Sequence, residues 1–267
     1  MADLVDRSRL SLTRARARED AMFLQHEAAA EVKDRLEMVN RGFTRIAVVT
    51  GFPDLWRGYF PDATVVADDD VLALEPGAHD LVIHGLSLHW SNDPVVQLFQ
   101  CGQALEPDGL FLGVTYAGQT LAELRAVLAE TEAELTGGLS PRVLPMANIA
   151  DLGSMLQMAG LALPVADSAV RTVTYGDLRA LLHDLRAMGE GNALKDRARV
   201  TGRGLFDRAA AHYMASYGAE GRIPATFEMV FLTGWAPHES QQKPLKPGSA
   251  SARLADALAQ ARSELPD

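Results

Sequence analysis

The sequence predicts an α/β fold with a doubly wound, mostly parallel sheet, because two buried strands flank a helix near its centre. Residues 80–84 and 110–116 are short apolar runs, which are typical of strands covered on both faces. Between them, residues 93–104 begin with Asp-Pro, a pair typical of a helix start. Glu-Pro-Asp-Gly at residues 106–109 predicts the turn that ends this helix and begins the next strand.

The flanking segments continue the alternation of strand and helix patterns. The other predicted strands are residues 45–50, 64–67, 163–175 and 226–235, and the other predicted helices are residues 21–39, 53–60, 120–135, 148–159, 177–188 and 204–217. We expect the helix at 21–39 to cover one edge of the sheet. Ligands of open α/β sheets bind beyond the carboxyl ends of the strands, so the loops 84–90 and 116–120 should face the site.

The chain divides by composition into three parts. An N-terminal basic arm and helix should occupy residues 1–40, and the main domain residues 41–236, with a helical insertion at about 177–220. Residues 237–267 form a Pro-rich tail, in which 250–258 could add a short helix that either folds back on the domain or binds a partner.

Bulk composition excludes several classes of protein. With 48% hydrophobic residues, a chain of 267 residues can fill a sizeable core. A net charge of −10 argues against a nucleic-acid-binding protein. Cys101 is the single cysteine, so we expect neither an internal disulfide nor a metal site. No apolar run approaches the roughly 18 residues of a membrane span. We expect a cytoplasmic protein in a bacterium, or a matrix protein in a mitochondrion.

Five arginines stand out against this acidic background. They are Arg7, Arg9, Arg14, Arg16 and Arg18. They form either a solvated helix face or an arm that docks on an acidic partner. Acidic residues within the same segment argue against a transit peptide.

Six motifs carry a resemblance to known proteins. They are LSLHWSND at 86–93, LEPDGLFL at 105–112, GQTLAELR at 118–125, SPRV at 140–143, DLRAMGEGNAL at 184–194 and LTGWAPHESQQKPLKPGSA at 232–250. With the order of strands and helices, they resemble the class I S-adenosylmethionine-dependent methyltransferase superfamily. The chain is most similar there to the methyltransferase-like mitochondrial complex I assembly factor family and its bacterial relatives. A weaker similarity links it to malonyl-acyl-carrier-protein O-methyltransferase.

The resemblance implies a Rossmann-like sheet shortened by one βα unit. Only 29 positions separate Gly51 from Asp80, and one strand pattern, residues 64–67, lies among them. By comparison with the family, this strand matches the one whose following acid lies near the adenine. The strand that carries the ribose-binding acid would then be missing, unless Asp68 or Asp69 has been recruited to the ribose.

The loop after the first strand also departs from the family. Such loops usually carry several glycines, so that the backbone can approach the cofactor and offer its N–H groups. Here Gly51 is followed by Phe52, which adds bulk, and by Pro53, which has no N–H to donate. We therefore expect S-adenosylmethionine, if any cofactor, to be held weakly or not at all. The resemblance places it on Gly51, Asp68, Gly85, Leu86 and Ser87.

Candidate substrate-side residues follow the central strands. His89 could be a catalytic base that deprotonates a methyl acceptor, or it could pack the lip of the pocket with Trp90. Tyr116 could line the acceptor site, while Arg142 and Arg186 could hold an acidic acceptor or form structural salt bridges. The sequence predicts no metal ligands.

The function predicted is that of a methyltransferase-family protein resembling complex I assembly factors, with a degenerate cofactor loop and a role in partner binding or assembly. The implied partner is a respiratory complex I subunit or an acyl carrier protein. The alternative is an active methyltransferase that acts on a protein side chain or an acyl-carrier-bound carboxylate. A further alternative is a pocket kept for a different small ligand.

Overall fold

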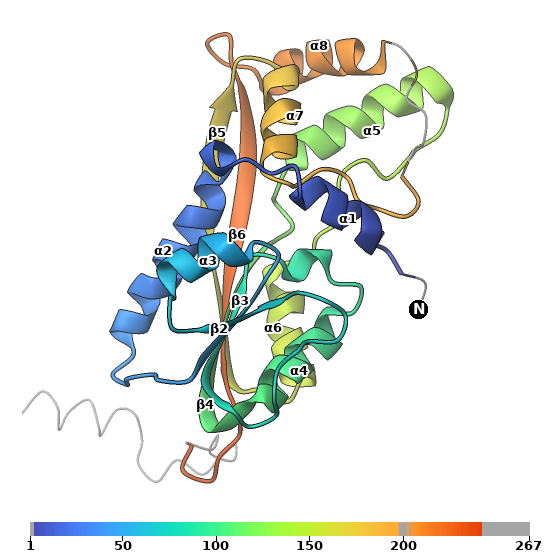
Figure 1. The fold of residues 1–267 in the computed structure, drawn as a ribbon. Coiled ribbons are helices and arrows are strands. Elements are labelled where there is room, and N and C mark those ends of the chain that lie inside the picture. Colours follow the sequence, from blue (N-terminus) through green and yellow to red (C-terminus); the bar gives the residue numbers. More distant parts are fainter. Residues whose placement is uncertain (1–2, 198–201, 203, 242–267) are drawn as a thin grey trace, which may run out of the picture. The chain divides into compact units, whose positions relative to one another are not determined.

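The computed structural model describes residues 3–197, 202 and 204–241. The chain divides into two units, Met1–Pro237 and His238–Asp267. Most of the predicted Pro-rich tail, including the helix expected at 250–258, lies outside the described residues. All helices and strands discussed below belong to the first unit (Figure 1).

The first unit contains a six-stranded mixed sheet. Its strands are β1 (Ile46–Thr50), β2 (Thr64–Ala67), β3 (His79–Gly85), β4 (Leu105–Tyr116), β5 (Ala162–Tyr175) and β6 (Ile223–Trp235). Their order is β2-β1-β3-β4-β6-β5, in which β1 to β4 are parallel and β6 is antiparallel to both of its neighbours. This order confirms the predicted Rossmann-like doubly wound sheet.

The helices follow the predicted order. They are α1 (Arg7–Arg14), α2 (Phe23–Met38), α3 (Pro53–Tyr59), α4 (Pro94–Ala104), α5 (Ala122–Thr136), α6 (Ile149–Met158), α7 (Leu178–Ala187) and α8 (Leu205–Tyr217), with short 3₁₀ turns at Glu19–Ala21 and Leu88–Trp90. Side-chain caps fix several starts: Asp93 accepts a hydrogen bond from Val96 N at 3.1 Å, and Asn148 accepts one from Asp151 N at 2.9 Å.

The position of β2 bears on the strand that the family comparison matched to the one near the adenine. Residues 64–67 form β2, which pairs directly with β1, with Val65 opposite Val48. In nucleotide-binding sheets of this type, the ribose-binding acid follows the strand next to the first. Asp68 therefore occupies that place, and the strand that the chain lacks is the outer one. Four half-exposed residues carry no local signal that says which neighbour they pair with.

Helices cover both faces of the parallel strands (Figure 1). Val48, Ile83 and Leu112 point into a core shared with α2 and α3. Their neighbours Val49, Val82 and Phe111 point into the core shared with α4 and α6. The expectation that α2 covers an edge is therefore wrong, because its buried stripe of small residues packs against a sheet face.

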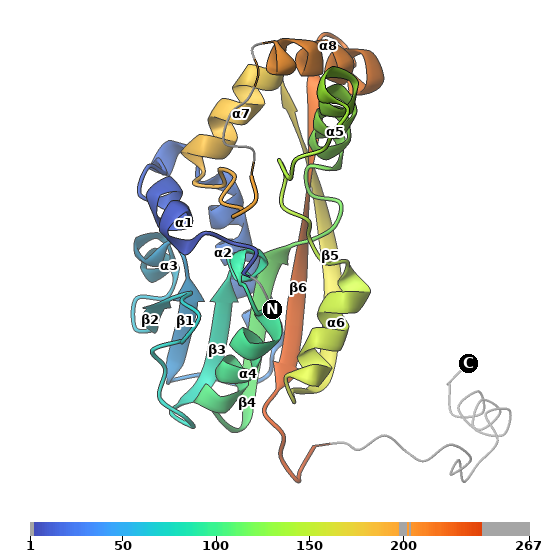
Figure 2. The same ribbon diagram turned by 90° about the vertical axis from the view of Figure 1, so that its right-hand side faces the viewer.

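A second group of helices lies where β5 and β6 extend beyond β4. The β4–β6 pairing ends at Met229, whereas β5 and β6 remain paired as far as Ile223. Helices α5, α7 and α8, here called the cap, pack around this extension (Figure 2). Tyr213 of α8 donates a hydrogen bond to Pro224 O at 2.8 Å, which joins the cap to the extended part of β6.

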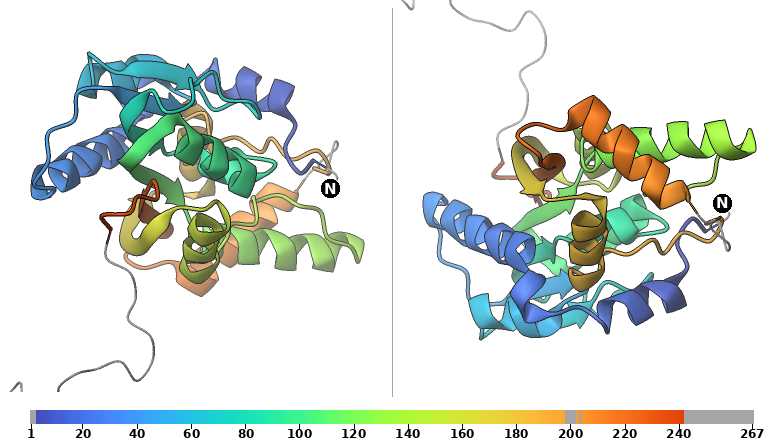
Figure 3. Two further views of the ribbon diagram at one scale, coloured as in Figure 1. Left: turned by 90° about the horizontal axis from the view of Figure 1, so that it is seen from below. Right: turned by 90° about the horizontal axis from the view of Figure 1, so that it is seen from above.

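The N-terminal segment lies against the chain that follows α7 (Figure 3). The backbone N–H of Asp6 donates to Ala193 O at 2.8 Å, and that of Arg18 donates to Ala187 O at 2.8 Å. Val5 and Leu194 also form an isolated β-bridge. These bonds hold α1 at the carboxyl end of the parallel strands.

Candidate functional site

A pocket of about 490 Å³ lies between α1 and the carboxyl ends of β1 and β2. We call it the β1–β2 cleft. Its floor comes from residues 50–55 and 67–69, and its roof comes from α1 and the residues that follow it. The cleft therefore includes Gly51 and Asp68, two of the predicted cofactor-binding residues.

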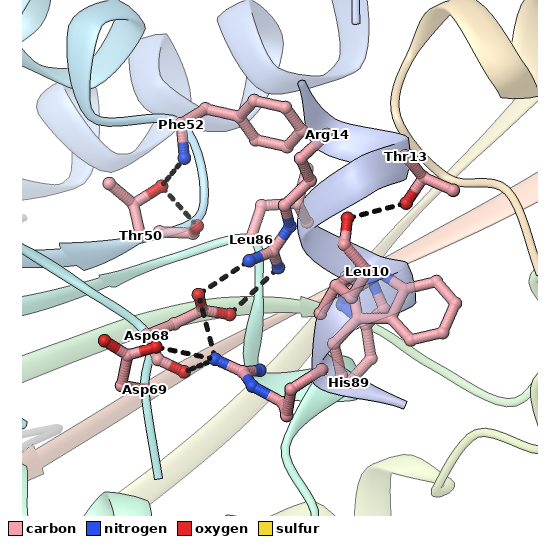
Figure 4. Close-up of polar contacts among 12 residues, drawn as sticks. Leu10, Thr13, Arg14, Thr50, Phe52, Asp68, Asp69, Leu86 and His89 are labelled. Atoms are coloured by element: carbon pink, nitrogen blue, oxygen red, sulfur yellow. Dashed lines mark hydrogen bonds and ion pairs between the residues drawn. The ribbon is translucent and has the colours of Figure 1, made fainter. Parts of the chain in front are cut away.

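Arg14 of α1 fills the centre of the β1–β2 cleft (Figure 4). Its Nη1 and Nη2 donate to the two carboxylate oxygens of Asp68 at 2.6 and 2.9 Å. A Cβ atom built on Gly51 would overlap the guanidinium, so the side chain lies directly on the glycine backbone. The ring of Phe52 lies on its other side, with 5.7 Å between its centroid and Arg14 Cζ. Arg14, one of the five N-terminal arginines, thus docks on an acid of the chain itself.

Arg7 adds a second cation to the same cluster. Its Nη2 donates to the backbone oxygen of Asp68 at 2.5 Å and to Asp69 Oδ1 at 3.3 Å. Burial alone would raise the pKa of Asp68, but the hydrogen bonds and charge of Arg14, with the charge of Arg7, outweigh it and lower this pKa. Asp68 is therefore a buried, ionised carboxylate whose oxygens are occupied by arginine.

The loop after β1 uses its polar groups internally. The N–H of Phe52 donates to Thr50 Oγ1 at 3.2 Å, and the Thr50 hydroxyl donates to Gly85 O at 3.1 Å. Pro53 begins α3 and has no N–H. Neither Phe52 nor Pro53 therefore offers a backbone N–H to a ligand.

The other predicted cofactor-binding residues are buried outside both pockets described here. Gly85 lies against Trp56, since a Cβ on this glycine would come within 2.5 Å of the indole. Leu86 has a positive φ of 43°, and its carbonyl accepts a 3.4 Å hydrogen bond from Gln25. The Ser87 hydroxyl is buried and has no hydrogen-bond partner among the described residues.

His89 is packed rather than open to a pocket. Its side chain is 1% exposed, its Nε2 lies 3.3 Å from Glu190 Oε2, and its ring centroid is 4.9 Å from that of Tyr116. The same Glu190 oxygen accepts a 2.8 Å hydrogen bond from Trp90 Nε1. His89 and Trp90 therefore share one carboxylate contributed by the segment after α7, an arrangement that matches the packing alternative.

A larger pocket of about 830 Å³ lies beneath the cap, and we call it the cap pocket. The four predicted substrate-side residues, Trp90, Tyr116, Arg142 and Arg186, all line it. Burial, with the nearby charge of Glu190, raises the pKa of Tyr116, so its phenol stays neutral. The structure thus brings together side chains that are up to 96 positions apart in sequence.

Four lining arginines were not predicted to belong to this site. They are Arg9, Arg16, Arg18 and Arg197. The arginine run near the N-terminus was a visible signal, but its sequence does not show which pocket it would reach. Arg18 also lines the β1–β2 cleft, so the two pockets are neighbours.

Arg142 is anchored by a buried acid at the edge of the cap pocket. It donates two hydrogen bonds to Glu132 at 2.6 and 3.1 Å, and Ser140 donates two more. The Arg142 hydrogen bond is the largest effect that lowers the pKa of Glu132 to about 2. The salt-bridge alternative given for Arg142 therefore describes its main contact, although the side chain still lines the pocket.

The described part of the chain contains neither a metal-binding cluster nor a membrane-spanning helix. None of its His, Cys, Asp and Glu residues form a group of three or more that could hold a metal ion. No helix there is both long and apolar enough to cross a bilayer.

Several curated proteins are similar in sequence. Arginine-hydroxylase NDUFAF5, mitochondrial, of Danio rerio is 40% identical over 197 residues, which is 73% of this chain and 61% of the relative. The human protein of the same name is 39% identical over 192 residues, or 72% and 56%. Malonyl-[acyl-carrier protein] O-methyltransferase of Xylella fastidiosa is 34% identical over 178 residues, or 66% and 58%. The chain thus spans less than two thirds of each of these relatives.

A solved structure supports the fold alone. A methyltransferase-fold protein of Bacillus halodurans aligns with a TM-score of 0.50 at 14% identity, covering 78% of this chain and 99% of that protein. No family model matches the sequence. The sequence similarities and the sheet order together identify the chain as a homologue of the NDUFAF5 and malonyl-[acyl-carrier protein] O-methyltransferase proteins, with the Rossmann-like fold of class I S-adenosylmethionine-dependent methyltransferases.

Proposed function

We propose that this protein is a methyltransferase homologue whose cofactor site is degenerate and which acts by binding a protein partner. The observation that carries the proposal is the position of Arg14, on the Gly51 backbone and bidentate on Asp68. These are the two places where a Rossmann-like site would hold the cofactor's backbone contacts and its ribose.

The residues of the β1–β2 cleft do not fit S-adenosylmethionine as they are arranged. A ribose needs carboxylate oxygens that can accept hydrogen bonds from its hydroxyls, and those of Asp68 are taken by Arg14. The methionine part needs backbone N–H groups, but Phe52 donates to Thr50 and Pro53 has none. The cleft would have to lose α1 before Asp68 could bind a ribose.

Resemblance to the relatives supports two proposed partners. Relatives are named arginine-hydroxylase NDUFAF5 and malonyl-[acyl-carrier protein] O-methyltransferase, and the family resemblance implies a respiratory complex I subunit or an acyl carrier protein. The NDUFAF5 relatives carry the word mitochondrial in their names. We place this chain in the mitochondrial matrix if its source is a eukaryote and in the cytoplasm if it is a bacterium.

A second candidate is an active methyltransferase in which α1 acts as a movable cover. The position of β2 favours it, because Asp68 follows the strand beside β1 as a ribose-binding acid should. In this case Gly51, Gly85, Leu86, Ser87 and Asp68 would hold S-adenosylmethionine, which supplies an electrophilic methyl group.

For this second candidate, the acceptor would enter from the cap pocket, toward Trp90, Tyr116, Arg142 and Arg186. His89 would have to leave Glu190 to act as a base. We therefore give His89 a positioning role, in which it orients Glu190 together with Trp90.

Calorimetry with S-adenosylmethionine and S-adenosylhomocysteine separates the two candidates. We expect no binding and no thermal shift for the wild-type protein at millimolar ligand. A ligand present at 100 times its Kd would raise the free energy of unfolding by about 2.7 kcal/mol, so binding would be visible as a shift. Arg14→Ala tests the cover, and Arg57→Ala, an exposed residue of α3, is the matched control. If Arg14→Ala binds the cofactor and wild type does not, Arg14 is the group that blocks the cleft, as the degenerate site requires, whereas the movable cover requires wild type to bind as well. Micromolar binding by wild type would refute the degenerate site.

The partner role needs a direct test with purified components. Labelled wild-type protein is titrated with an acyl carrier protein and, separately, with complex I subunits, and binding is read by fluorescence anisotropy. The proposal expects saturable binding to one of them that needs no added cofactor. Failure to bind any of them, together with methyl transfer by wild type, would assign the protein to the second candidate.

A further inference from the structure

We propose that the cap pocket binds an anionic amphiphile, a small molecule with a carboxylate or phosphate head and an apolar chain. This inference goes beyond the proposed function and is independent of whether the β1–β2 cleft binds a cofactor. It rests on the charge of the pocket rim and the chemistry of the pocket walls.

The rim of the cap pocket is strongly basic, although the whole chain has a net charge of −10. Its lining contains one acidic residue, Glu190, and six arginines: Arg9, Arg16, Arg18, Arg142, Arg186 and Arg197. Arginine side chains thus outnumber acids in the lining, and those whose charge is not balanced nearby would concentrate anions there.

Half of these arginines have their charge balanced nearby. Arg142 pairs with Glu132, Arg18 pairs with Asp20 and Arg197 pairs with Asp6. Glu190 contributes one negative charge to the lining, and it lies against Trp90 and His89, because its Oε2 accepts a hydrogen bond from Trp90 Nε1 and lies 3.3 Å from His89 Nε2.

The remaining three arginines are left for a ligand. Within the described residues, Arg9, Arg16 and Arg186 make no ion pair. They come from the N-terminal segment and from α7, on separate parts of the pocket lining. Guanidinium groups suit carboxylate and phosphate oxygens, which they can bind with two parallel hydrogen bonds.

The walls behind the rim are apolar. They include Leu124 and Leu128 of α5, Leu182 of α7, Phe206 of α8 and Phe227 of β6. A volume of about 830 Å³ lies within the 300–1,000 Å³ usual for small-molecule sites. A fully polar anion would leave these walls wetted, whereas an apolar chain would cover them.

The same charges disfavour a cationic substrate. A guanidinium entering the pocket would meet three unpaired arginines and would find its only acid already hydrogen-bonded. A cationic head group should therefore bind less tightly than an anionic one on the same apolar chain.

The test compares ligands that share a chain and differ in the head group. Isothermal titration of the full chain uses decanoate, decyl phosphate, decanol and decyltrimethylammonium, each below its micelle concentration. We expect saturable binding of one or both anions, with at least tenfold weaker binding of the cation. A preference for decanoate or for decyl phosphate identifies the head group.

Variants connect the binding to the rim. Arg16→Gln and Arg186→Gln should each weaken anion binding about tenfold, the usual loss for one charge-assisted hydrogen bond. Arg186→Lys should retain most of the affinity. Arg179→Gln is the control, because Arg179 lies on the same helix, is 81% exposed and pairs with Asp207 outside the pocket. Melting temperatures verify that each variant is folded.

Several outcomes would overturn the inference. They are equal binding of anion and cation, unchanged affinity in both glutamine variants, and no binding of either anion. Tighter binding of a polyglutamate peptide than of decanoate would also overturn it, because the apolar walls would then have no role and an acidic protein segment would be the occupant.

Discussion

Replacing Arg14 with methionine should destabilise the protein substantially at neutral pH. Methionine keeps the apolar stem of the side chain but removes the cation that pairs with Asp68. The two side chains are 12% and 3% exposed, so the carboxylate would be left almost fully buried and without its bidentate partner. Breaking such a buried pair costs about 3–5 kcal/mol. Because Arg7 Nη2 remains 3.6 Å from Asp68, we expect a loss at the lower end of that range.

The loss should also depend on pH. In the wild-type protein the pKa of Asp68 is lowered, so its stabilising charge is present above its ordinary pKa of 3.8 and is lost as the pH falls through the lower folded value. In Arg14→Met the burial of Asp68 dominates instead, and the pKa of this carboxyl rises. The variant gains relative stability when Asp68 takes up a proton, so the difference between the two proteins should shrink from pH 7 to pH 4.

Urea unfolding at pH 7 and pH 4 measures both effects, with midpoints compared at a common slope. Asp68→Asn and the double variant Arg14→Met/Asp68→Asn complete a cycle, in which we expect a coupling of about 1–3 kcal/mol. A loss below about 1 kcal/mol at pH 7, or an equal loss at both pH values, would show that Arg14 does not hold the cleft closed through Asp68.

Three further predictions concern other parts of the fold. Glu132→Gln should cost about 2–3 kcal/mol near neutral pH by removing the charge that Arg142 binds. Since the pKa of Glu132 is about 2, wild type should lose this advantage between pH 4.5 and 2, which acid titrations monitored by circular dichroism can detect. Gly85→Ala should cost about 1–3 kcal/mol, because its Cβ would come within 2.5 Å of Trp56. Gly58→Ala, in α3 with no atom within 4 Å of its Cβ, should instead stabilise the protein by about 0.5–1 kcal/mol in urea unfolding, and a loss there would contradict our account of the helix.

The order of helices and strands could be predicted because it depends on local patterns. Val48, Ile83 and Leu112 belong to unbroken apolar runs, and Asp93 and Asn148 are caps that act within one turn. The limits of β4 differ from the predicted strand at 110–116: it begins at Leu105 and includes the expected turn, where Asp108 has a positive φ of 63°.

Neighbour relations could not be read from the same patterns. The sequence marked both the N-terminal arginines and Asp68, but their pairing joins residues 54 positions apart, and any arginine of the run could have been the partner. His89 meets Glu190 across 101 positions for the same reason. Charge and size say that a side chain needs a partner, whereas the tertiary fold decides which one it finds.

The contact between the N-terminal segment and the chain that follows α7 bears on the order of events during synthesis. Lys195 binds Asp3 and donates its N–H to Leu4 O, so the roof of the β1–β2 cleft depends on residues made about 190 positions later. At about 5–20 residues per second, a ribosome needs roughly 10–40 s to cover that distance. For this interval the backbone bonds that join the N-terminal segment to residues 187–195 cannot form, and α1 can be held over β1 and β2 only through the contacts of Arg7 and Arg14 with Asp68.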